Sequence, residues 1–171
     1  MTRIVTRLML ACVVAGLASC GLDIVKFDVV EEGQVGLAGV NIPGLTNFGS
    51  SMRDALSTEG VNPGDVDSMH VLSGSIDMTS QGGITQDLSF FESLEFVVSA
   101  KGMQSRTLAV APALTQGTRT AELEVDSELD LKPYLKAGDM TVEIVAVMNP
   151  VPADRVDLKI VFRVRVDVNV V

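Results

Sequence analysis

The C-terminal segment, residues 155–171, constrains the fold more than any other part of this chain. Apolar and polar side chains alternate almost throughout RVDLKIVFRVRVDVNVV. Successive side chains of a β-strand point to opposite faces, so this pattern predicts a strand with one buried and one solvated face. The expected buried face holds Val156, Leu158, Ile160, Phe162, Val164, Val166, Val168 and Val170. Because most strands have only about 3 to 10 residues, we expect this one to bend, to carry a bulge or to pair with two neighbours in turn.

Weaker alternation predicts further strands at residues 23–31, 66–79, 94–110, 120–131 and 140–148. Gly74 is a candidate for a bulge in the second of these. The segment 94–110 reads as a hairpin that turns at Lys101 and Gly102. A two-residue turn there would place Phe96 and Thr107 on the same face.

Three short helical pieces are expected between the strands, at residues 50–59, 87–94 and 130–138. Ser50 or Ser51 can cap the first piece, and Gly138 can end the third. Seven or so strands without strand–helix alternation favour a mainly all-β fold. We expect an antiparallel β-sandwich of immunoglobulin-like architecture, with two or three short helices in its connections. The chain has no Trp for the usual immunoglobulin core, so this expectation concerns architecture alone.

Residues 1–19 have the features of a signal peptide that is cleaved from the mature protein. Arg3 and Arg7 precede the apolar run at residues 8–17, and the small residues Ala18 and Ser19 follow it. The run has about half of the ~20 residues that a membrane-spanning helix needs. The remaining residues, 20–171, are expected to form a single domain.

The end of this segment, Leu17, Ala18, Ser19 and Cys20, resembles the lipobox of bacterial lipoproteins. The resemblance covers residues 1–20 and implies cleavage by signal peptidase II before Cys20. It also implies that Cys20 carries a lipid anchor with palmitate-type acyl chains, and two or three such chains hold a protein on a membrane. Gly21 is not the aspartate that retains many such proteins in the inner membrane. We therefore expect a bacterial cell-envelope protein, anchored by lipid to the outer membrane.

The charge of the mature chain argues against nucleic acid as a partner. Removing residues 1–19 takes away two of the 13 basic residues and none of the 22 acidic ones, which leaves a formal net charge of −11. Binding to phosphates requires clusters of Lys and Arg, which this sequence lacks. The acidity favours solubility instead.

The chain offers little for catalysis, so we expect a protein that is not an enzyme and has no cofactor. Cys12 leaves with the signal peptide, and His70 is the one histidine. A nucleophile needs a base within hydrogen-bond reach, and zinc needs three or four His or Cys ligands. Tyr134 is expected to pack its ring on the core, and the absence of Trp disfavours a carbohydrate site.

We expect no bound metal, and calcium is the only candidate because it accepts oxygen ligands alone. One acidic cluster surrounds the turn GVNPGDVD and holds Glu59, Asn62, Asp65 and Asp67. A second set recurs at every other residue and is expected on one strand face: Glu122, Glu124, Asp126, Glu128 and Asp130. Both patterns are weak evidence for calcium, since a solvated turn and a solvated strand face without metal have the same acidic residues.

These features favour an envelope lipoprotein that binds a protein partner or takes part in an assembly. Residues 164–171 are our preferred element for pairing with a partner strand. The alternative is a periplasmic carrier or chaperone for an apolar, lipid-like ligand, and a hydrolase is the less favoured third class. Partner binding predicts an exposed apolar patch or an open sheet edge, whereas a carrier predicts an enclosed apolar cavity.

Overall fold

The computed structural model describes residues 23–80, 87–152 and 154–169. Its strands are β1 (Asp23–Gly36), β2 (Gly39–Asn41), β3 (Val66–Met78), β4 (Phe91–Ser99), β5 (Arg106–Val110), β6 (Thr120–Val125), β7 (Thr141–Met148) and β8 (Val156–Val168). Its helices are α1 (Pro43–Thr46), α2 (Phe48–Thr58) and α3 (Lys132–Ala137), with one 3-10 turn, η1 (Leu88–Phe90). Every strand pairing is antiparallel. The expectation of a mainly β, antiparallel fold with short connecting helices is confirmed.

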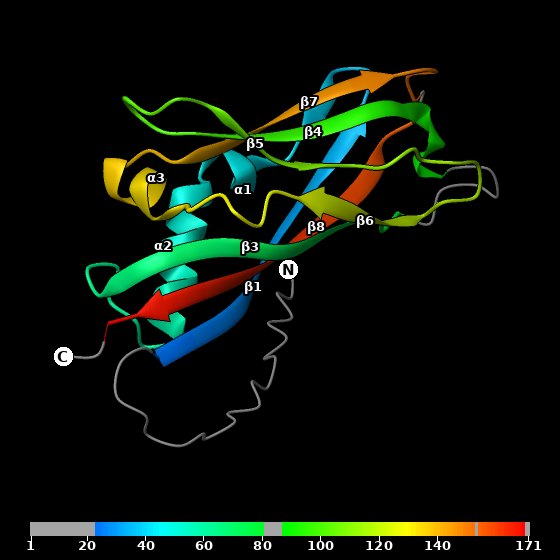
Figure 1. The fold of residues 1–171 in the computed structure, drawn as a ribbon. Helices are drawn as coiled ribbons and strands as arrows, with labels where there is room; N and C mark the ends of the chain where they lie inside the picture. The colour runs from blue at the N-terminus through cyan, green and yellow to red at the C-terminus, as the bar shows by residue number, and fades with distance from the viewer. Residues whose placement is uncertain (1–22, 81–86, 153, 170–171) are drawn as a thin grey trace, which may run out of the picture.

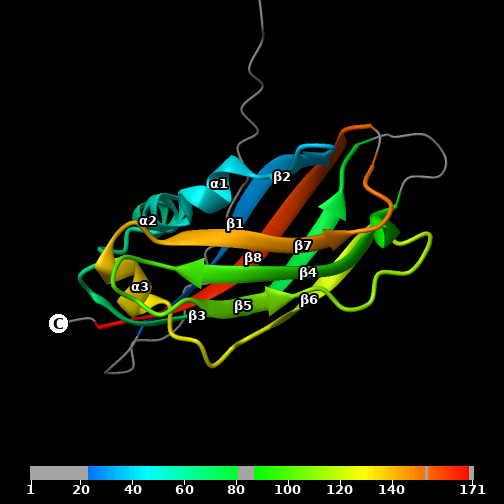
Figure 2. The same ribbon diagram turned by 90° about the horizontal axis from the view of Figure 1, so that it is seen from above.

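Within the described residues the strands form one continuous sheet in the order β2-β1-β8-β3-β6-β5-β4-β7. The sheet curls so that β4, β5 and β7 lie over β1, β8 and β3, with β6 at the bend (Figure 1). The two separate sheets of an immunoglobulin-like sandwich are not confirmed, because β6 pairs with both β3 and β5 and joins the layers. The sheet is therefore barrel-like, and α1 and α2 lie beside β1 and β7 where its two edges approach (Figure 2).

The long C-terminal strand, β8, is central in this sheet. β1 pairs along one side of it, from Asp23 opposite Val168 to Val35 opposite Val156, and β3 pairs along the other side. All of its predicted inward-facing residues within the described range are buried, from Val156 to Val168. The preferred role of residues 164–171 in strand addition is wrong for Val164–Val168, since two neighbours already use the backbone groups of this part.

Aromatic rings fill the space inside the curled sheet. Phe162 of β8 contacts Phe96 of β4 and Phe48 of α2 edge to face, with ring centroids 5.5 and 5.8 Å apart. All three side chains are fully buried. Gly74 of β3 faces the same core, and a Cβ on it would lie 3.1 Å from Leu123 and Phe162. Close packing explains this glycine, and the bulge in β3 lies just before it, between Val71 and Ser73.

β4 and β5 form the predicted hairpin, but the register that we predicted for it is wrong. Phe96 lies opposite Ala109 rather than Thr107, because the connection is longer than two residues and the pairing shifts after Phe96. Leu108 and Ala109 are therefore buried, and Thr107 is exposed. An irregularity of one residue moves all later side chains to the other face.

The helices differ from the predictions mainly at their ends. α2 begins at Phe48, before the predicted serine caps, and its Met52 and Leu56 are buried as their spacing suggests. Only one 3-10 turn forms in residues 87–94, where Asp87 accepts a hydrogen bond from the Ser89 N–H at 2.8 Å. α3 ends at Ala137, and Gly138 is its C-cap, as predicted. β2 and α1 were not predicted.

Candidate functional site

The two edges of the curled sheet approach each other at a seam that α1 bridges. β7 pairs only with β4, and the other edge consists of β1 and the short β2. α1 packs against both β1 and β7, and it inserts Leu45 into the core. At the start of α2, the N–H of Gly49 donates to the Met140 carbonyl just before β7 at 2.8 Å. The seam is thus closed by helices rather than by strand pairing (Figure 2).

A carboxylate lies beneath this seam, inside the sheet. Glu31 follows Phe27 and Val29 on the inward face of β1 and is only 7% exposed. It is the one buried charged residue among those that the structure describes. Its Oε1 atom is fully buried and has no hydrogen-bond partner. A carboxylate in an apolar interior is costly unless it is paired, so such groups mark candidate functional sites.

Two glycines make room for this arrangement. A Cβ on Gly44 of α1 would lie 1.3 Å from Oε2 of Glu31, so any other residue there would have to displace this carboxylate. A Cβ on Gly33 would lie 2.3 Å from the Asn41 carbonyl oxygen, because the chain that leads into α1 crosses β1 at this point. The sequence IPG at residues 42–44 suits this close approach, since Pro43 starts the helical turn and Gly44 lacks a side chain.

An open groove of about 370 Å³ runs along the line where α1 meets β7. The wall on the α1 side includes Ile42 and Leu45, which lie on either side of Gly44 along the chain. The wall on the β7 side runs from Thr141 to Ile144 and includes the carboxylate of Glu143. A second open hollow, of about 470 Å³, borders the same segment at Asn41 and Pro43. The hollows beside the seam are therefore surface grooves, and Glu31 is not among the residues that line either of them.

Beyond the groove, the outer edge of β7 has no strand partner among the described residues. Val145 and Val147 on this strand are 47% and 51% exposed. Glu143 is the only charged residue of β7. Proteins commonly protect a sheet edge with charges, proline or a covering element, because an open apolar edge pairs with other chains. The second half of β7 lacks such protection.

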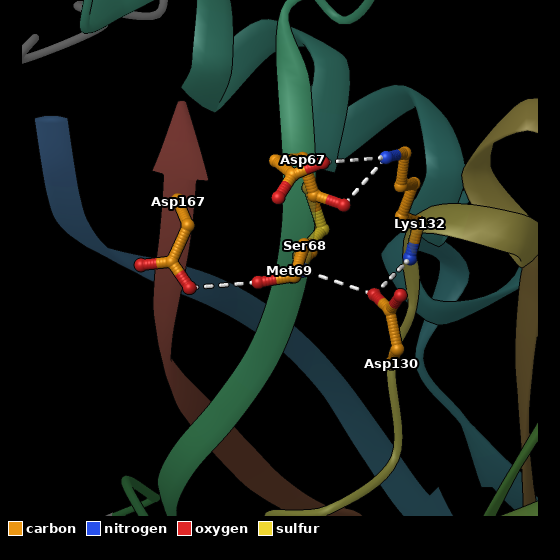
Figure 3. Close-up of polar contacts among 6 residues, drawn as sticks. All are labelled: Asp67, Ser68, Met69, Asp130, Lys132 and Asp167. Atoms are coloured by element: carbon orange, nitrogen blue, oxygen red, sulfur yellow. Dashed lines mark hydrogen bonds and ion pairs between the residues drawn. The ribbon is translucent and has the colours of Figure 1, made fainter. Parts of the chain in front are cut away.

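A polar network fixes the opposite end of the molecule, where β1 begins (Figure 3). Asp130 accepts hydrogen bonds from the backbone N–H groups of Met69 and Lys132, at 3.0 and 2.9 Å. The ammonium group of Lys132 donates to the backbone carbonyl of Asp67. These contacts attach the start of α3 to the start of β3. Asp23, which begins β1, is three residues after Cys20, so this is the end nearest the expected lipid.

Asp167 belongs to the same end of the sheet. The hydroxyl of Ser68 donates to its Oδ2 at 2.7 Å, and the Nη2 of Arg165 donates to its Oδ1 at 2.9 Å. The Ser68 hydroxyl, together with the Arg165 guanidinium, holds the pKa of Asp167 below its usual range. The arrangement stabilises the pairing of β3 with β8.

Among the residues predicted from the sequence, the lipidation motif Leu17, Ala18, Ser19 and Cys20 lies outside the described residues. The calcium candidates do not converge on one point. Asn62 donates to the Asp65 carboxylate at 3.1 Å, Asp67 lies 3.4 Å from the Lys132 ammonium, and Glu59 is the C-cap of α2. In the described part of the chain, no three His, Cys, Asp or Glu side chains form a group that could hold a metal.

The second acidic set is not one strand face, so that expectation is wrong. β6 ends at Val125 and holds only Glu122 and Glu124, because the chain turns at Asp126, whose carboxylate accepts the Glu128 N–H at 3.1 Å. His70 lies on the outer face of β3 opposite Arg165. Tyr134 is buried and donates its hydroxyl to the Gln104 carbonyl at 2.7 Å.

Our sequence analysis missed Glu31, although a signal was present. Val25, Phe27, Val29 and Val35 share one face of the first strand, and Glu31 falls on that face. A charged residue at an inward position of an apolar alternation indicates a functional or structural exception. The need for glycine at positions 33 and 44 could not be predicted, because it comes from contacts between segments that are separate in the sequence.

No helix of the described residues is long and apolar enough to cross a membrane. The chain matches no family model, no curated protein and no solved structure.

Proposed function

We propose that this protein is a lipid-anchored envelope lipoprotein that binds a protein partner, without catalysis, through the open edge of β7. The unpaired second half of β7, with Val145 and Val147 exposed, is the observation that supports this proposal. An open sheet edge is the feature that distinguishes partner binding from the carrier alternative. The grooves beside the seam are open, whereas a carrier needs an enclosed apolar cavity.

The position of β7 suits a protein held by its N-terminus. β7 begins with Thr141 opposite Ser99, on the side of α3, and ends with Met148 opposite Phe91 at the far end of the sheet. The exposed valines therefore lie toward the end away from Asp23 and the proposed anchor. The two facing layers of the curled sheet act as a sandwich-like scaffold that presents this edge to a partner, in our proposal at the outer membrane.

The lipid anchor is tested by Cys20→Ser. In cells supplied with labelled palmitate, the wild-type chain should incorporate the label, and the variant should incorporate none and accumulate as uncleaved precursor. Unchanged processing of the variant would contradict the anchor.

Partner binding is tested by photocrosslinking in intact cells, with benzoylphenylalanine in place of Val147. A matched probe replaces Leu72, which is 38% exposed on the outer face of β3. We expect a discrete crosslinked protein from position 147 and none from position 72. Equal products from both positions, or none from position 147, would overturn the proposal.

A further inference from the structure

We propose that the groove between α1 and β7 takes an extended segment of the partner that carries a lysine or arginine, and that this basic side chain pairs with Glu31. The inference rests on the proposed function, because it identifies the chemistry of the partner that binds at the β7 edge.

The burial of Glu31 is the first argument. Its Oε1 atom is buried with no partner, and the residue is 7% exposed. Burying an unpaired carboxylate is unfavourable, and buried charges in proteins are normally paired or hydrogen-bonded. The described residues offer no salt bridge or hydrogen bond to Glu31. In this proposal a basic side chain of the partner supplies the counter-charge.

The position of the carboxylate is the second argument. Glu31 lies directly under Gly44, and Leu45, the next residue of α1, lines the groove together with Ile42. Glu31 itself does not line the groove, since its carboxylate lies against Gly44 of α1. Lysine and arginine carry their charge at the end of a long, slender apolar stem, which suits a site between apolar walls. A small movement of residues 43–46 would admit such a side chain.

The geometry of the sheet edge is the third argument. A strand that pairs with β7 would point alternate side chains inward, as Val142 and Ile144 of β7 do. Glu31 is on the same inward side of the sheet. One extended segment can therefore pair with the open edge and also direct a side chain toward Glu31 once residues 43–46 have moved aside.

The charge of the groove favours a basic side chain over a metal ion. Glu143 lines the groove and adds a second negative charge near its opening. A calcium ion would need six or more oxygen ligands, whereas no group of three acidic or histidine side chains exists among the described residues. An ammonium or guanidinium group is satisfied by one carboxylate and nearby carbonyls.

The test measures binding of defined peptides to the full-length lipidated protein in detergent. The host peptide alternates Val and Thr, and its central residue is Lys, Arg, Gln or Glu. We expect the Lys and Arg peptides to bind about tenfold or more tightly than the Gln peptide, because a desolvated charge pair couples at least that strongly. The Glu31→Gln variant should lose this preference and keep its affinity for the Gln peptide. The control Glu122→Gln, on the exposed outer face of β6, should change neither value.

The outcomes separate the two proposals. If all peptides bind equally well to the wild-type protein and crosslink at position 147, the edge binds partners but Glu31 does not select them. A preference for Lys that survives in Glu31→Gln would also overturn the role of Glu31. If no peptide binds and position 147 gives no crosslink in cells, both proposals fail. Thermal unfolding of Glu31→Gln shows whether that variant keeps the fold.

Discussion

Gly44 of α1 rests directly on Glu31 of β1, so closely that a Cβ on Gly44 would lie 1.3 Å from the carboxylate Oε2. Gly44→Ala should therefore displace the Glu31 carboxylate, which is buried and has little room to move. We expect a loss of about 1–3 kcal/mol in the free energy of unfolding, the usual effect of overpacking a buried site. Urea denaturation followed by circular dichroism measures it.

A double-mutant cycle identifies the cause of that loss. In a Glu31→Ala background the carboxylate is absent, so Gly44→Ala should cost much less than in the wild-type chain. Equal costs in both backgrounds would show that the contact between these two residues is not responsible.

The unpaired charge of Glu31 gives a prediction of opposite sign. Glu31→Met removes the buried carboxylate and keeps a side chain of similar length in an apolar site. We expect the variant to be more stable at neutral pH by about 1–4 kcal/mol, as when buried ionic groups are replaced by apolar ones. A higher denaturation midpoint confirms it. A clear loss of stability would mean that Glu31 has a favourable partner in the free protein.

The central strand and the isolated buried charge differ in how far the sequence predicts them. The alternation from Val156 to Val168 gave the buried face of β8 correctly, because period two is a local property of the chain. The joining of the layers through β6 and the shift after Phe96 are set by contacts between distant segments, so local periodicity could not supply them.

The candidate site shows the same division. Glu31 was readable as an exception on an apolar face. The sequence does not show that Glu31 lacks a partner or that Gly44 packs against it, because both depend on the path of the chain after β1. The open edge of β7 depends on which strands pair in the sheet. The proposed lipid site on Cys20 differs from Glu31 in this respect, since it was predicted from a short sequence motif alone and does not depend on the fold.

The aromatic contacts of Phe162 predict how much stability is lost when its ring is removed from the core. Phe162→Ala removes a fully buried ring that contacts Phe48 and Phe96 edge to face. We expect a loss of about 3–5 kcal/mol in the free energy of unfolding, from lost burial and from the cavity left behind. Phe162→Leu is the control and should cost less, because it leaves a smaller cavity. Similar losses for the two variants would show that the core collapses around the deletion.

The lowered pKa of Asp167 makes the end of the sheet where β1 begins sensitive to acid. The Ser68 hydroxyl and the Arg165 guanidinium favour the charged carboxylate in the folded state, whereas an unfolded aspartate has a pKa of about 3.9. The folded state therefore gains stability above about pH 4, and this gain is lost as the pH falls below about 4 through the lower folded pKa.

Asp167→Asn should remove this dependence on pH. We expect the variant to be less stable than the wild-type chain at pH 7, and the difference to shrink steadily as the pH falls below about 4, where the wild-type carboxylate also becomes neutral. Urea denaturation at a series of pH values measures the difference. Asp28→Asn, a change at an exposed position on the outer face of β1, is the matched control for loss of one negative charge. If both variants show the same dependence on pH, net charge rather than the contacts of Asp167 determines the acid sensitivity.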